Sequence, residues 1–318
     1  MLCQVDFNWR RYRKFDLKVH DAVIIMSVFN GEKYVIEQID SILRQESANV
    51  KLWIRDDGST DSTVSLISEK YANDDRVFIQ KGKNLGACKS FIEAVFCCDF
   101  VGDYYGFSDA DDVWVIDKIK HSVDLLKKEG SGIPVAVFTR LQIVNESLGP
   151  IGYSKVPRKG LNFKNAIVES VASGASILMN EQAFKIIRSA RPSHAVMHDA
   201  WVYLVISAFG KLIYSEYPTI KYRQHGSNVI GASRSLKKKI ISRFSRLSNV
   251  SPFRIQAEEF MQLFGKSLSK ENYVILDRYC NHDSSFRRRV MFAINPSVYF
   301  QSVKASIYLR LLSLLGKV

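Results

Sequence analysis

Two segments of the chain run from apolar residues directly into a cluster of carboxylates. They are residues 50–63, VKLWIRDDGSTDST, and residues 104–114, YYGFSDADDVW. Exposed carboxylates repel one another, so a cluster at the end of a strand is more often a site than an accident of the surface. Such oxygens suit two tasks, which are binding a hard divalent cation and accepting hydrogen bonds from the base or ribose of a nucleotide.

The second cluster has the composition of a metal site. Asp109, Asp111 and Asp112 offer carboxylate oxygens to Mg²⁺ or Mn²⁺, and a cation held by one or two carboxylates keeps open positions for a diphosphate. The segment is not an EF-hand, because no glycine occupies the sixth position and no glutamate the twelfth. The alternative is an acidic loop that binds no ligand. It is less favoured because the first acidic cluster also follows the end of a strand.

The first cluster is explained only in part by local structure. Gly58 and Asp61 fit a turn that leads into a capped helix. That turn does not account for the adjacent acids Asp56 and Asp57, which we expect to contact a base or ribose. Taken alone, the segment fits a solvated strand–turn–helix as well as it fits a ligand site.

Two further segments place a histidine beside groups that can take part in catalysis. In MHDAW, Asp199 is a candidate general base, although His198 and Asp199 also fit an N-cap on an exposed turn. A metal phosphohydrolase would need more histidine and aspartate partners at helical spacing, and we find none. In YRQHGSN, His225 is a candidate ligand of metal or phosphate and Arg223 a candidate partner of phosphate, although a lone histidine is more often structural.

A basic segment, KGKNLGACKSF, is expected just after a strand and at the N-terminus of a helix. Lys83, Asn84 and Lys89 there suit an anion, because the first N–H groups and the dipole of a helix attract negative charge. The segment is not a P-loop, since the GxxxxGK[ST] spacing is absent. No GxGxxG follows a strand either, which excludes the dinucleotide fingerprint.

Apolar periodicity predicts the elements that position these motifs. Runs typical of strands alternate with helical patterns, which predicts an α/β fold with a mostly parallel sheet covered by helices on both faces. Ligands of such sheets bind beyond the carboxyl ends of the strands, where both acidic clusters fall. Expected strands are 22–28, 50–56, 76–81, 103–109, 134–145 and 173–180; expected helices are 32–45, 61–71, 86–98, 115–128, 180–190 and 199–210; and a strand pair or extended return is expected over 211–226.

Basic residues are concentrated near the end of the sequence. The 318 residues carry a formal net charge of +13. Residues 232–318 hold 16 Lys and Arg against 5 Asp and Glu, whereas residues 1–231 hold 29 against 27. The shift in composition at Ala232 therefore predicts a domain boundary there.

Several other kinds of segment are not predicted. No apolar run approaches the roughly 18 residues that a membrane-spanning helix needs. The opening segment MLCQVDFNWRRYRKF is basic but lacks the apolar stretch of a secretory signal. The five cysteines show neither metal spacing nor a paired framework, which predicts a reduced, cytosolic setting.

The order of these motifs resembles that of bacterial family-two glycosyltransferases of the GT-A fold. The resemblance covers about residues 21–230 and rests on IIMSVFNGEKYVIEQIDSILRQ, IRDDGSTDST, KNLGACKSFIEA, FSDADDVWVIDKI, HDAW and YRQHGSN, in that order. HDAW and YRQHGSN look most like the rhamnosyltransferase branch, which assembles capsule, O-antigen and other cell-wall polysaccharides. The resemblance implies a GT-A Rossmann-like fold and transfer of a sugar from a nucleotide-sugar.

The resemblance also implies a role for each motif. Asp199 matches the family's catalytic base, and Asp111 its main metal ligand. Phe29 stands where the family usually has tyrosine, so one polar contact is missing. The implied nucleotide-sugar contacts are Ser27, Phe29, Asp56, Asp57, Lys83, Asn84, Lys89, Asp109 and Asp112; the implied ligands of Mn²⁺ or Mg²⁺ are Asp109, Asp111 and His225; and the implied acceptor contacts are Trp114, His198 and Trp201.

We therefore expect a metal-dependent inverting transferase with dTDP-L-rhamnose as preferred donor and a UDP-hexose (galactose, glucose or N-acetylhexosamine) as the alternative. The acceptor is expected to be a lipid-linked saccharide, and the enzyme to be cytoplasmic and peripheral on the inner face of the plasma membrane. Its basic C-terminal region would bind anionic lipid there, or would simply pack on the catalytic domain. The expected domains are a basic extension over 1–20, a catalytic domain over 21–231 with a nucleotide-binding half (21–114) and an acceptor half (115–231), and a basic helical region over 232–318.

Two other classes of function fit the sequence less well. The net charge and the RRR run at 287–289 raise the possibility of a nucleic-acid-binding protein, but the charge is confined to the C-terminal region and no known nucleic-acid motif appears, so no nucleic-acid partner is expected. A nucleotidyltransferase that makes sugar nucleotides would share the fold class and the metal. It would need a glycine- and arginine-rich loop near the first strand, where the sequence reads SVFNGEKY.

Overall fold

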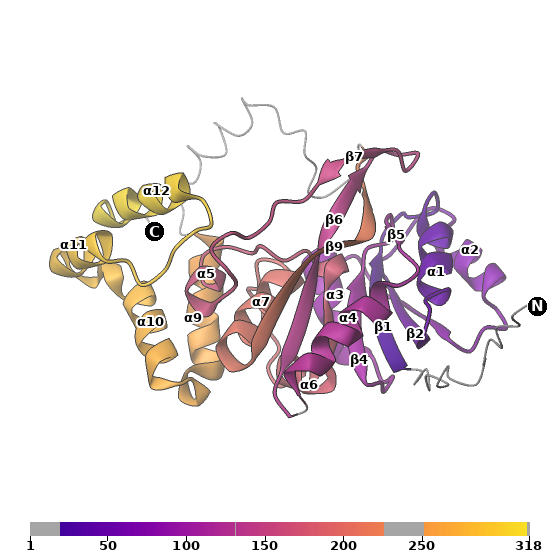
Figure 1. Cartoon of the computed structure of the whole chain (residues 1–318), viewed down its shortest axis with the longest axis horizontal. Helices are drawn as coiled ribbons and strands as arrows, with labels where there is room; N and C mark the ends of the chain where they lie inside the picture. The colour runs from indigo at the N-terminus through magenta and orange to yellow at the C-terminus, as the bar shows by residue number, and fades with distance from the viewer. Residues whose placement is uncertain (1–19, 131, 226–250, 317–318) are drawn as a thin grey trace, which may run out of the picture.

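The structure is a computed structural model that describes residues 20–130, 132–225 and 251–316. Within these residues, a nine-stranded sheet carries helices on both faces (Figure 1). Six strands run in one direction and three against it, which confirms the expected mostly parallel α/β sheet. The strands are β1 (His20–Val28), β2 (Ala48–Asp56), β3 (Val77–Lys81), β4 (Tyr104–Ser108), β5 (Val113–Trp114), β6 (Val135–Val144), β7 (Pro150–Tyr153), β8 (Leu178–Asn180) and β9 (Lys211–Arg223).

The first half of the sheet is parallel, with β1 between β2 and β4 and with β3 outside β2. Successive side chains of a strand point to opposite faces, so a strand covered on both sides must be apolar at every position. In β1, Val23 and Ile25 pack into one hydrophobic cluster, and Ala22, Ile24 and Met26 pack into another on the opposite face. The unbroken apolar run of β1 is therefore explained by its place between two hydrophobic cores, one on each face of the sheet.

The second half of the sheet is mixed. β8 pairs antiparallel with β4 and β6, and β6 pairs parallel with β9. The short strands β5 and β7 add antiparallel pairs to β9 and β6. The region expected as a strand pair or an extended return is one long strand, β9, whose register with β6 is irregular between Thr139 and Leu141.

The helices divide between the two clusters. Apolar residues of α1, α2 and α4 belong to one cluster, and those of α3, α5, α6 and α7 belong to the other. The helices are α1 (Val35–Leu43), α2 (Thr63–Lys70), α3 (Ala87–Cys97), α4 (Lys118–Leu126), α5 (Phe163–Ala166), α6 (Glu181–Arg188), α7 (His198–Phe209), α9 (Pro252–Phe264), α10 (Lys270–Cys280), α11 (Phe286–Ile294) and α12 (Val303–Leu314), with short 3₁₀ turns η2 (Lys127–Glu129), η3 (Gly174–Ser176), η5 (Gly265–Ser267) and η6 (His282–Ser284).

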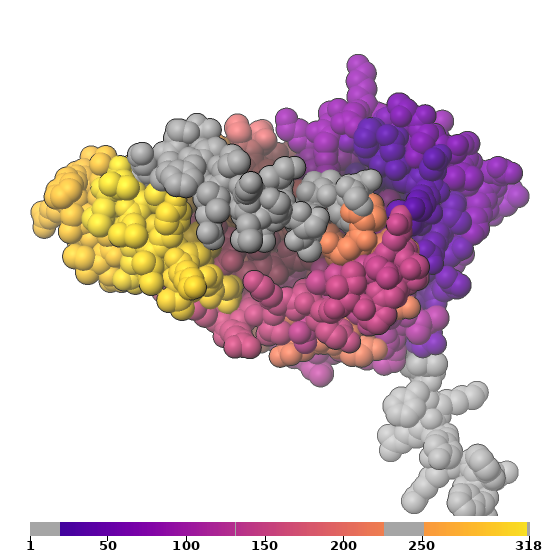
Figure 2. All heavy atoms as spheres, turned by 90° about the horizontal axis from the view of Figure 1, so that it is seen from above, coloured from indigo at the N-terminus to yellow at the C-terminus, as the bar shows by residue number. Residues whose placement is uncertain are grey.

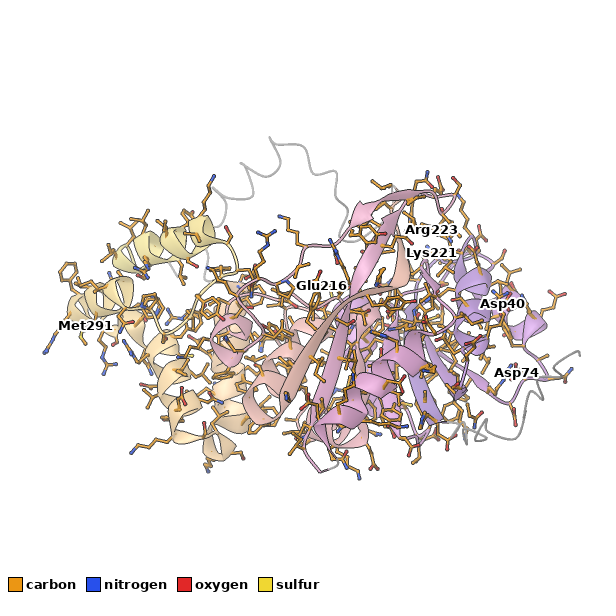
Figure 3. The ribbon with its side chains drawn as sticks, viewed as in Figure 1. Asp40, Asp74, Glu216, Lys221, Arg223 and Met291 are labelled. Atoms are coloured by element: carbon orange, nitrogen blue, oxygen red, sulfur yellow. The ribbon has the colours of Figure 1, made fainter. Side chains whose placement is uncertain are left out.

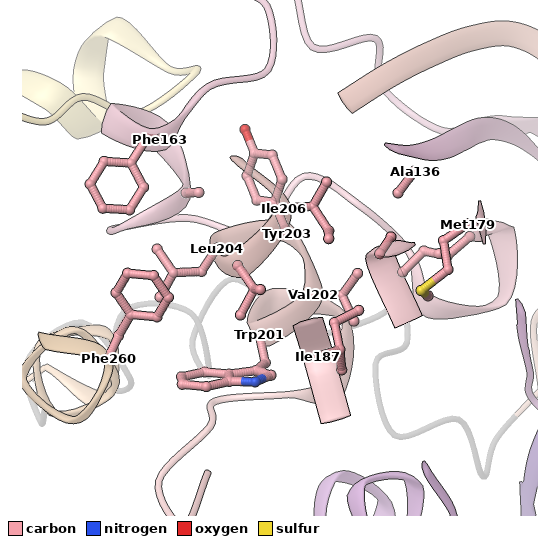
Figure 4. Packing of buried hydrophobic residues seen from close by; sticks show 14 of the residues in the cluster. Ala136, Phe163, Met179, Ile187, Trp201, Val202, Tyr203, Leu204, Ile206 and Phe260 are labelled. Carbon is pink, nitrogen blue, oxygen red and sulfur yellow. The ribbon is translucent and has the colours of Figure 1, made fainter. Parts of the chain in front are cut away.

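Helices α9 to α12 lie together at the end of the molecule opposite β1 and β2 (Figure 1). They are not separated from the sheet by a gap in packing, because Phe260 and Phe264 of α9 contact the indole ring of Trp201 in α7 (Figure 4). The basic segment at 232–250 and the N-terminal extension lie outside the described residues, so the division of the chain at residue 232 stays a prediction. No helix within the described residues is long and apolar enough to cross a bilayer.

Candidate active site

The two acidic segments begin at the same edge of the sheet. Val28 of β1 lies opposite Asp56 of β2, and Met26 of β1 lies opposite Ser108 of β4, in parallel register. The carboxyl ends of β2 and β4 therefore flank the carboxyl end of β1. This is the edge at which α/β sheets bind their ligands, as the sequence predicted.

The carboxylate of Asp57 is buried and organises the loop that leads into α3. It pairs with the guanidinium of Arg55, and its two oxygens accept hydrogen bonds from the backbone N–H groups of Leu85 and Gly86, both at 2.9 Å. A buried carboxylate needs hydrogen-bond partners such as these, because it has left water. Asp57 thus fixes the position of the basic loop between β3 and α3.

Asp56 is also buried, and it closes the turn that follows β2. Its carboxylate accepts hydrogen bonds from the backbone N–H groups of Gly58 and Ser59, each at 3.2 Å. Gly58 has a φ of +80°, a conformation that glycine adopts without strain. Both Asp56 and Asp57 therefore bind the chain itself in this structure.

The loop after β1 is tied to the loop after β2. Asn30, with a φ of +49°, accepts a hydrogen bond from the N–H of Thr60 at 2.8 Å, and the N–H of Gly31 donates to the hydroxyl of Thr63 at 2.8 Å. Residues 32–34, which were expected to be helical, form a turn after this linked loop. Helix α1 therefore begins at Val35, three residues after the expected start.

The side chains expected at the nucleotide differ in exposure along this edge. Phe29 is 50% exposed just beyond β1, where an aromatic ring is free to stack. Ser27, in contrast, is bonded inward, since its hydroxyl lies 2.5 Å from that of Ser90, which accepts a hydrogen bond from Arg55. Ser27 therefore belongs to the network that supports Asp57.

The basic loop presents its side chains to solvent. Lys83, Asn84 and Lys89 are all exposed, while the backbone carbonyl of Lys83 accepts a hydrogen bond from Arg55 at 3.0 Å. Lys83, Asn84 and Lys89 therefore form a positively charged rim on a segment whose backbone is held by hydrogen bonds. Such a rim suits an anionic ligand at the edge of the sheet.

Asp111, which follows β4, contacts His225, which follows β9. The Nε2 atom of His225 lies 2.8 Å from an oxygen of Asp111, although the two residues are 114 positions apart. The ring of Tyr34 lies 5.0 Å from the imidazole, and the Tyr34 hydroxyl donates to Glu146 at 2.6 Å. The two residues expected to ligate one metal are therefore in contact, beside an aromatic side chain that the sequence did not indicate. The segment that follows His225 lies outside the described residues.

Asp109 and Asp112 add negative charge at the same place. Burial, together with the charges of Asp111 and Asp199, raises the pKa of Asp109 to about 7. Burial also raises the pKa of Asp112, whose Oδ1 accepts a hydrogen bond from the N–H of Arg223 at 3.0 Å. The other oxygen of Asp112 is buried and has no hydrogen-bond partner within the described residues.

Arg223 does not face a phosphate, and that prediction is wrong. Its side chain is buried, donates to the carbonyl of Asp111 at 2.8 Å and pairs with Glu37 of α1. The guanidinium also lies 4.5 Å from the ring centre of Tyr34 (Figure 3 shows Arg223 at the end of β9). Arg223 thus holds the acidic loop against β9, because a buried guanidinium needs several partners of this kind.

These carboxylates fit a hard divalent cation. Asp111 and His225 are in contact, one buried oxygen of Asp112 has no partner within the described residues, and the pKa of Asp109 is raised by burial and by the charges of Asp111 and Asp199, which a cation would offset. Within the described residues, however, no three histidine, cysteine, aspartate or glutamate side chains are already arranged around a common metal position. Asp109, Asp111, Asp112 and His225 are the residues that would hold the ion.

Asp199 lies at the start of α7 and belongs to the same site. Its oxygens accept hydrogen bonds from the N–H of Ala200 at 2.7 Å and from the N–H of Gly174 at 3.1 Å. Burial raises its pKa to about 6, and its charge in turn acts on Asp109. A carboxylate with a pKa close to neutrality is well suited to accept a proton.

His198 was expected at the acceptor, and the structure places it elsewhere. Its ring is buried, stacks on Phe91 at 3.9 Å and meets the edge of Phe107 at 5.0 Å. Burial lowers its pKa to about 3, so the ring is neutral. A Cβ atom on Gly174 would lie 2.2 Å from its Nε2, which explains why a glycine is needed where η3 passes.

The two tryptophans expected at the acceptor are also buried. Trp201 is 2% exposed and packs against Phe260 and Phe264 of α9 (Figure 4). Trp114 is 4% exposed and lies 4.5 Å from the ammonium of Lys118, whose pKa burial lowers to about 7. Both indoles are therefore core residues, because helices that follow them in the chain cover the faces from which they project.

Helix α9 holds the segment that leads into Asp199. Glu259 accepts hydrogen bonds from the N–H groups of Ser193 and His194, at 2.7 and 2.8 Å. Gln256, which is fully buried, accepts one from the N–H of Val196 at 2.8 Å. Helix α9 thus fixes residues 193–196, which lead into the candidate base at the start of α7.

Sequence reasoning did not find these supporting residues. Glu259 and Gln256 lie about 60 positions from the N–H groups that they bind, and Gly174 lies 25 positions from Asp199. None belongs to a local motif. Ser90 is a similar case, because a serine inside a helix gives no sign that it bonds to a strand tip.

The fold and the acidic edge define the protein as an α/β enzyme of the GT-A kind. The family model for glycosyl transferase family 2 matches residues 23–187, more than half of the chain. The chain therefore belongs to glycosyl transferase family 2 and is a glycosyltransferase.

Curated relatives agree with this membership. The chain is 29% identical over 232 residues to the dTDP-rhamnosyl transferase RfbG of Shigella flexneri, covering 67% of this chain and 76% of that protein. It is 24% identical over 286 residues to an uncharacterized glycosyltransferase of Haemophilus influenzae, covering 80% of this chain and 86% of that protein.

Solved structures show the same fold. S. aureus TarS residues 1–349 in complex with UDP aligns with a TM-score of 0.53 at 16% identity, covering 86% of this chain and 75% of that one. The same TarS fragment with UDP-GlcNAc aligns with a TM-score of 0.54 at 13% identity, covering 93% of this chain and 91% of that one.

Proposed function

We propose that this glycosyltransferase moves a sugar from a nucleotide-sugar to a hydroxyl of a saccharide acceptor, with inversion at the anomeric carbon. The contact between Asp111 and His225, with Asp199 in the same acidic site, is the observation that carries the proposal. A nucleoside diphosphate would bind along the edge formed by β1, β2 and β4. Its base would lie near Phe29, and its phosphates near the rim of Lys83, Asn84 and Lys89.

The reaction is a single displacement. The acceptor oxygen forms a bond to the anomeric carbon as the bond from that carbon to the diphosphate breaks, and the acceptor proton passes to Asp199. The hydrogen bonds from Ala200 and Gly174 hold the carboxylate in one orientation for this step. Because its pKa of about 6 lies below neutral pH, Asp199 is ionised and still basic enough to accept the proton.

The departing diphosphate accumulates negative charge, which must be neutralised at the acidic edge. Mn²⁺ or Mg²⁺, bound by Asp111, Asp109 and His225, would supply that neutralisation as a Lewis acid. Asp112 and Arg223 keep the acidic loop in place, since the carboxylate of Asp112 accepts a hydrogen bond from the N–H of Arg223 and the side chain of Arg223 donates to the carbonyl of Asp111. The supporting observation is that one buried oxygen of Asp112, next to Asp111 in the chain, has no hydrogen-bond partner in the part of the chain that the structure describes.

The preferred donor is dTDP-L-rhamnose, which the similarity to RfbG supports. A UDP-hexose is the second candidate, since TarS of the same fold binds UDP-GlcNAc. We further propose a lipid-linked saccharide acceptor, a role in surface polysaccharide synthesis, and a cytoplasmic enzyme bound to the inner face of the plasma membrane.

A panel of sugar nucleotides tests the donor. Thermal unfolding of the full chain is measured with dTDP-rhamnose, UDP-galactose, UDP-glucose and UDP-GlcNAc, each with Mn²⁺ and with EDTA. We expect the largest rise in melting temperature with dTDP-rhamnose and Mn²⁺, and little rise in EDTA. A larger rise with a UDP-sugar would move the donor assignment to the second candidate, and no rise with any of them would contradict the proposal.

A further inference from the structure

Helices α11 and α12 expose an unusual number of large apolar side chains. The two helices pack against each other and form one end of the molecule (Figure 2). Figure 3 shows Met291 at that end, pointing away from the sheet. We call this surface the α11–α12 face; its apolar members, all at least 39% exposed, are Phe286, Met291, Ile294, Val303, Ile307, Tyr308, Leu311, Leu314 and Leu315.

The apolar side chains of α12 lie on more than one side of the helix. Val303, Ile307 and Leu311 are four residues apart, so they form one stripe, and they are 62%, 53% and 56% exposed. Leu309, on another side, is buried against the neighbouring helices. A helix that is apolar on several sides is normally covered in a water-soluble protein. Here only one side is covered.

The charge of this face has a single sign. Residues 284–318 contain six Lys and Arg and no Asp or Glu. Residues 251–283, which form α9 and α10, contain four Lys and Arg and five Asp and Glu. Within the C-terminal helices, the net positive charge is therefore confined to α11, α12 and the residues around them, whereas acids outnumber bases in α9 and α10. Arg287, Arg288, Lys304 and Arg310 are the exposed cations of the α11–α12 face.

Exposed apolar side chains together with positive charge favour one of three partners that could cover the α11–α12 face, namely a second copy of the chain, a nucleic acid or a lipid bilayer. A second copy of the chain in a two-fold contact would bring like-charged arginines together without an acid to neutralise them. A nucleic acid would use the cations but would leave the apolar side chains in water. An anionic lipid bilayer satisfies both, since its phosphates pair with arginine and lysine and its acyl region accepts the apolar side chains.

We propose that the α11–α12 face docks on an anionic phospholipid bilayer. The apolar side chains enter the boundary between headgroups and acyl chains, and the four cations contact lipid phosphates. Helices α9 and α10 remain in water, between the membrane-bound helices and the segment that precedes Asp199. The inference rests on the proposed function only in that a lipid-linked acceptor would be presented at this surface.

Sedimentation of the full chain with vesicles tests the proposal. Vesicles of phosphatidylglycerol and phosphatidylcholine are compared with vesicles of phosphatidylcholine alone. Two double variants remove the apolar and the charged contribution separately, namely Ile307→Asp with Leu311→Asp, and Arg287→Gln with Arg288→Gln. Since each surface cation contributes about 1 kcal/mol, loss of both arginines is expected to weaken binding by about 30-fold. The apolar double variant is expected to lose at least roughly tenfold.

Matched controls come from the neighbouring helices. Val274→Asp places a charge at an exposed apolar position of α10, and Lys266→Gln with Lys270→Gln removes two exposed cations outside the face. Both controls are expected to sediment as the unaltered chain does. Binding of dTDP with Mn²⁺, measured without vesicles, reports the fold and the active site of every variant. A failure of the proposed function would therefore appear there and not in sedimentation.

Three results would overturn the inference. The first is equal binding to both kinds of vesicle. The second is binding by the two double variants of the face that matches the unaltered chain. The third is a dimer in solution, seen by light scattering, that Ile307→Asp with Leu311→Asp dissociates while neither vesicle binds, since a second copy would then be the occupant of the face.

Discussion

Replacing Asp199 by asparagine removes one negative charge and keeps the size of the side chain. In the native protein, burial raises the pKa of this carboxyl to about 6 from its ordinary value of 3.8. The backbone N–H groups of Ala200 and Gly174 oppose that rise but do not cancel it. The variant keeps an acceptor for one of these donors and loses the ability to take a proton.

The magnitude follows from the shift in pKa. Because the folded pKa of Asp199 lies above the unfolded one, the folded protein binds this proton more tightly. The resulting stability is fully present below about pH 3.8 and is lost as pH rises through about 6. A shift of about two units corresponds to about 3 kcal/mol, at about 1.36 kcal/mol per unit. Because the unfolded carboxyl is already partly ionised at pH 4, the difference in unfolding free energy between the two proteins should move in favour of Asp199→Asn by about 2.4 kcal/mol between pH 4 and pH 7.

Urea unfolding at pH 4, 5.5 and 7, in EDTA so that no metal binds the acidic edge, measures this difference. The hydrogen bonds that the variant loses change its unfolding free energy by the same amount at every pH. They therefore do not alter how the difference between the two proteins depends on pH. A difference that stays the same across these pH values would refute the reasoning that Asp199 is desolvated. In the transferase assay at pH 8, loss of the general base should lower kcat by about 10²- to 10⁴-fold while nucleotide binding survives. Transfer at the native rate would refute its role as the base.

Other substitutions test the rest of the site. Asp111→Asn should remove the Mn²⁺-dependent part of dTDP binding in calorimetry, and an unchanged affinity in Mn²⁺ would contradict that assignment. Glu259→Ala removes the acceptor of two backbone N–H groups before α7, so kcat should fall by about tenfold or more, with the KM for the donor nearly unchanged; an equal loss of donor affinity would show a general structural effect instead. Gly174→Ala forces a methyl group against His198 and should cost about 1–3 kcal/mol of unfolding free energy, whereas Gly152→Ala, which has open space and ordinary backbone angles, should cost much less; equal effects would count against the close packing.

The sequence predicted the arrangement of the sheet because that arrangement follows from short-range patterns. An apolar run such as β1, followed by a helical pattern and another apolar run, requires a parallel crossover, and parallel strands put their carboxyl ends at one edge. The convergence of residues 56–57 with 109–112 is a direct consequence. The contact of Asp111 with His225 was expected only because each residue type suits a metal ligand and because the resemblance to a family gave both that role. No local pattern joins positions so far apart.

The errors concern which side chains become buried. Trp201 has a polar N–H and follows a candidate base, which favoured a place at the acceptor. Its burial depends on Phe260 and Phe264, which lie about 60 positions later and belong to α9. Arg223 was assigned to a phosphate because of its charge, but a carboxylate of α1 takes that charge. Whether a side chain is exposed depends on the assembled fold, so it does not follow from the residue type or its neighbours in the sequence.

The supporting residues were missed for the same reason. Glu259 and Gln256 bind backbone N–H groups of a segment about 60 positions earlier, and a glutamate or glutamine on a helix gives no sign of such a partner. The sequence also treated the basic C-terminal region as an appendage. In the structure α9 is part of the core beside α7, and positive charge gathers on the later helices.

The most direct measurement is the anomalous diffraction of manganese in crystals of the full chain grown with Mn²⁺ and dTDP. We predict one strong peak bound by Asp111 and by the diphosphate, on the same side of the sheet edge as Asp199. A peak away from Asp111, or a diphosphate separated from Asp199 by the sheet, would contradict a metal-assisted transfer at this edge.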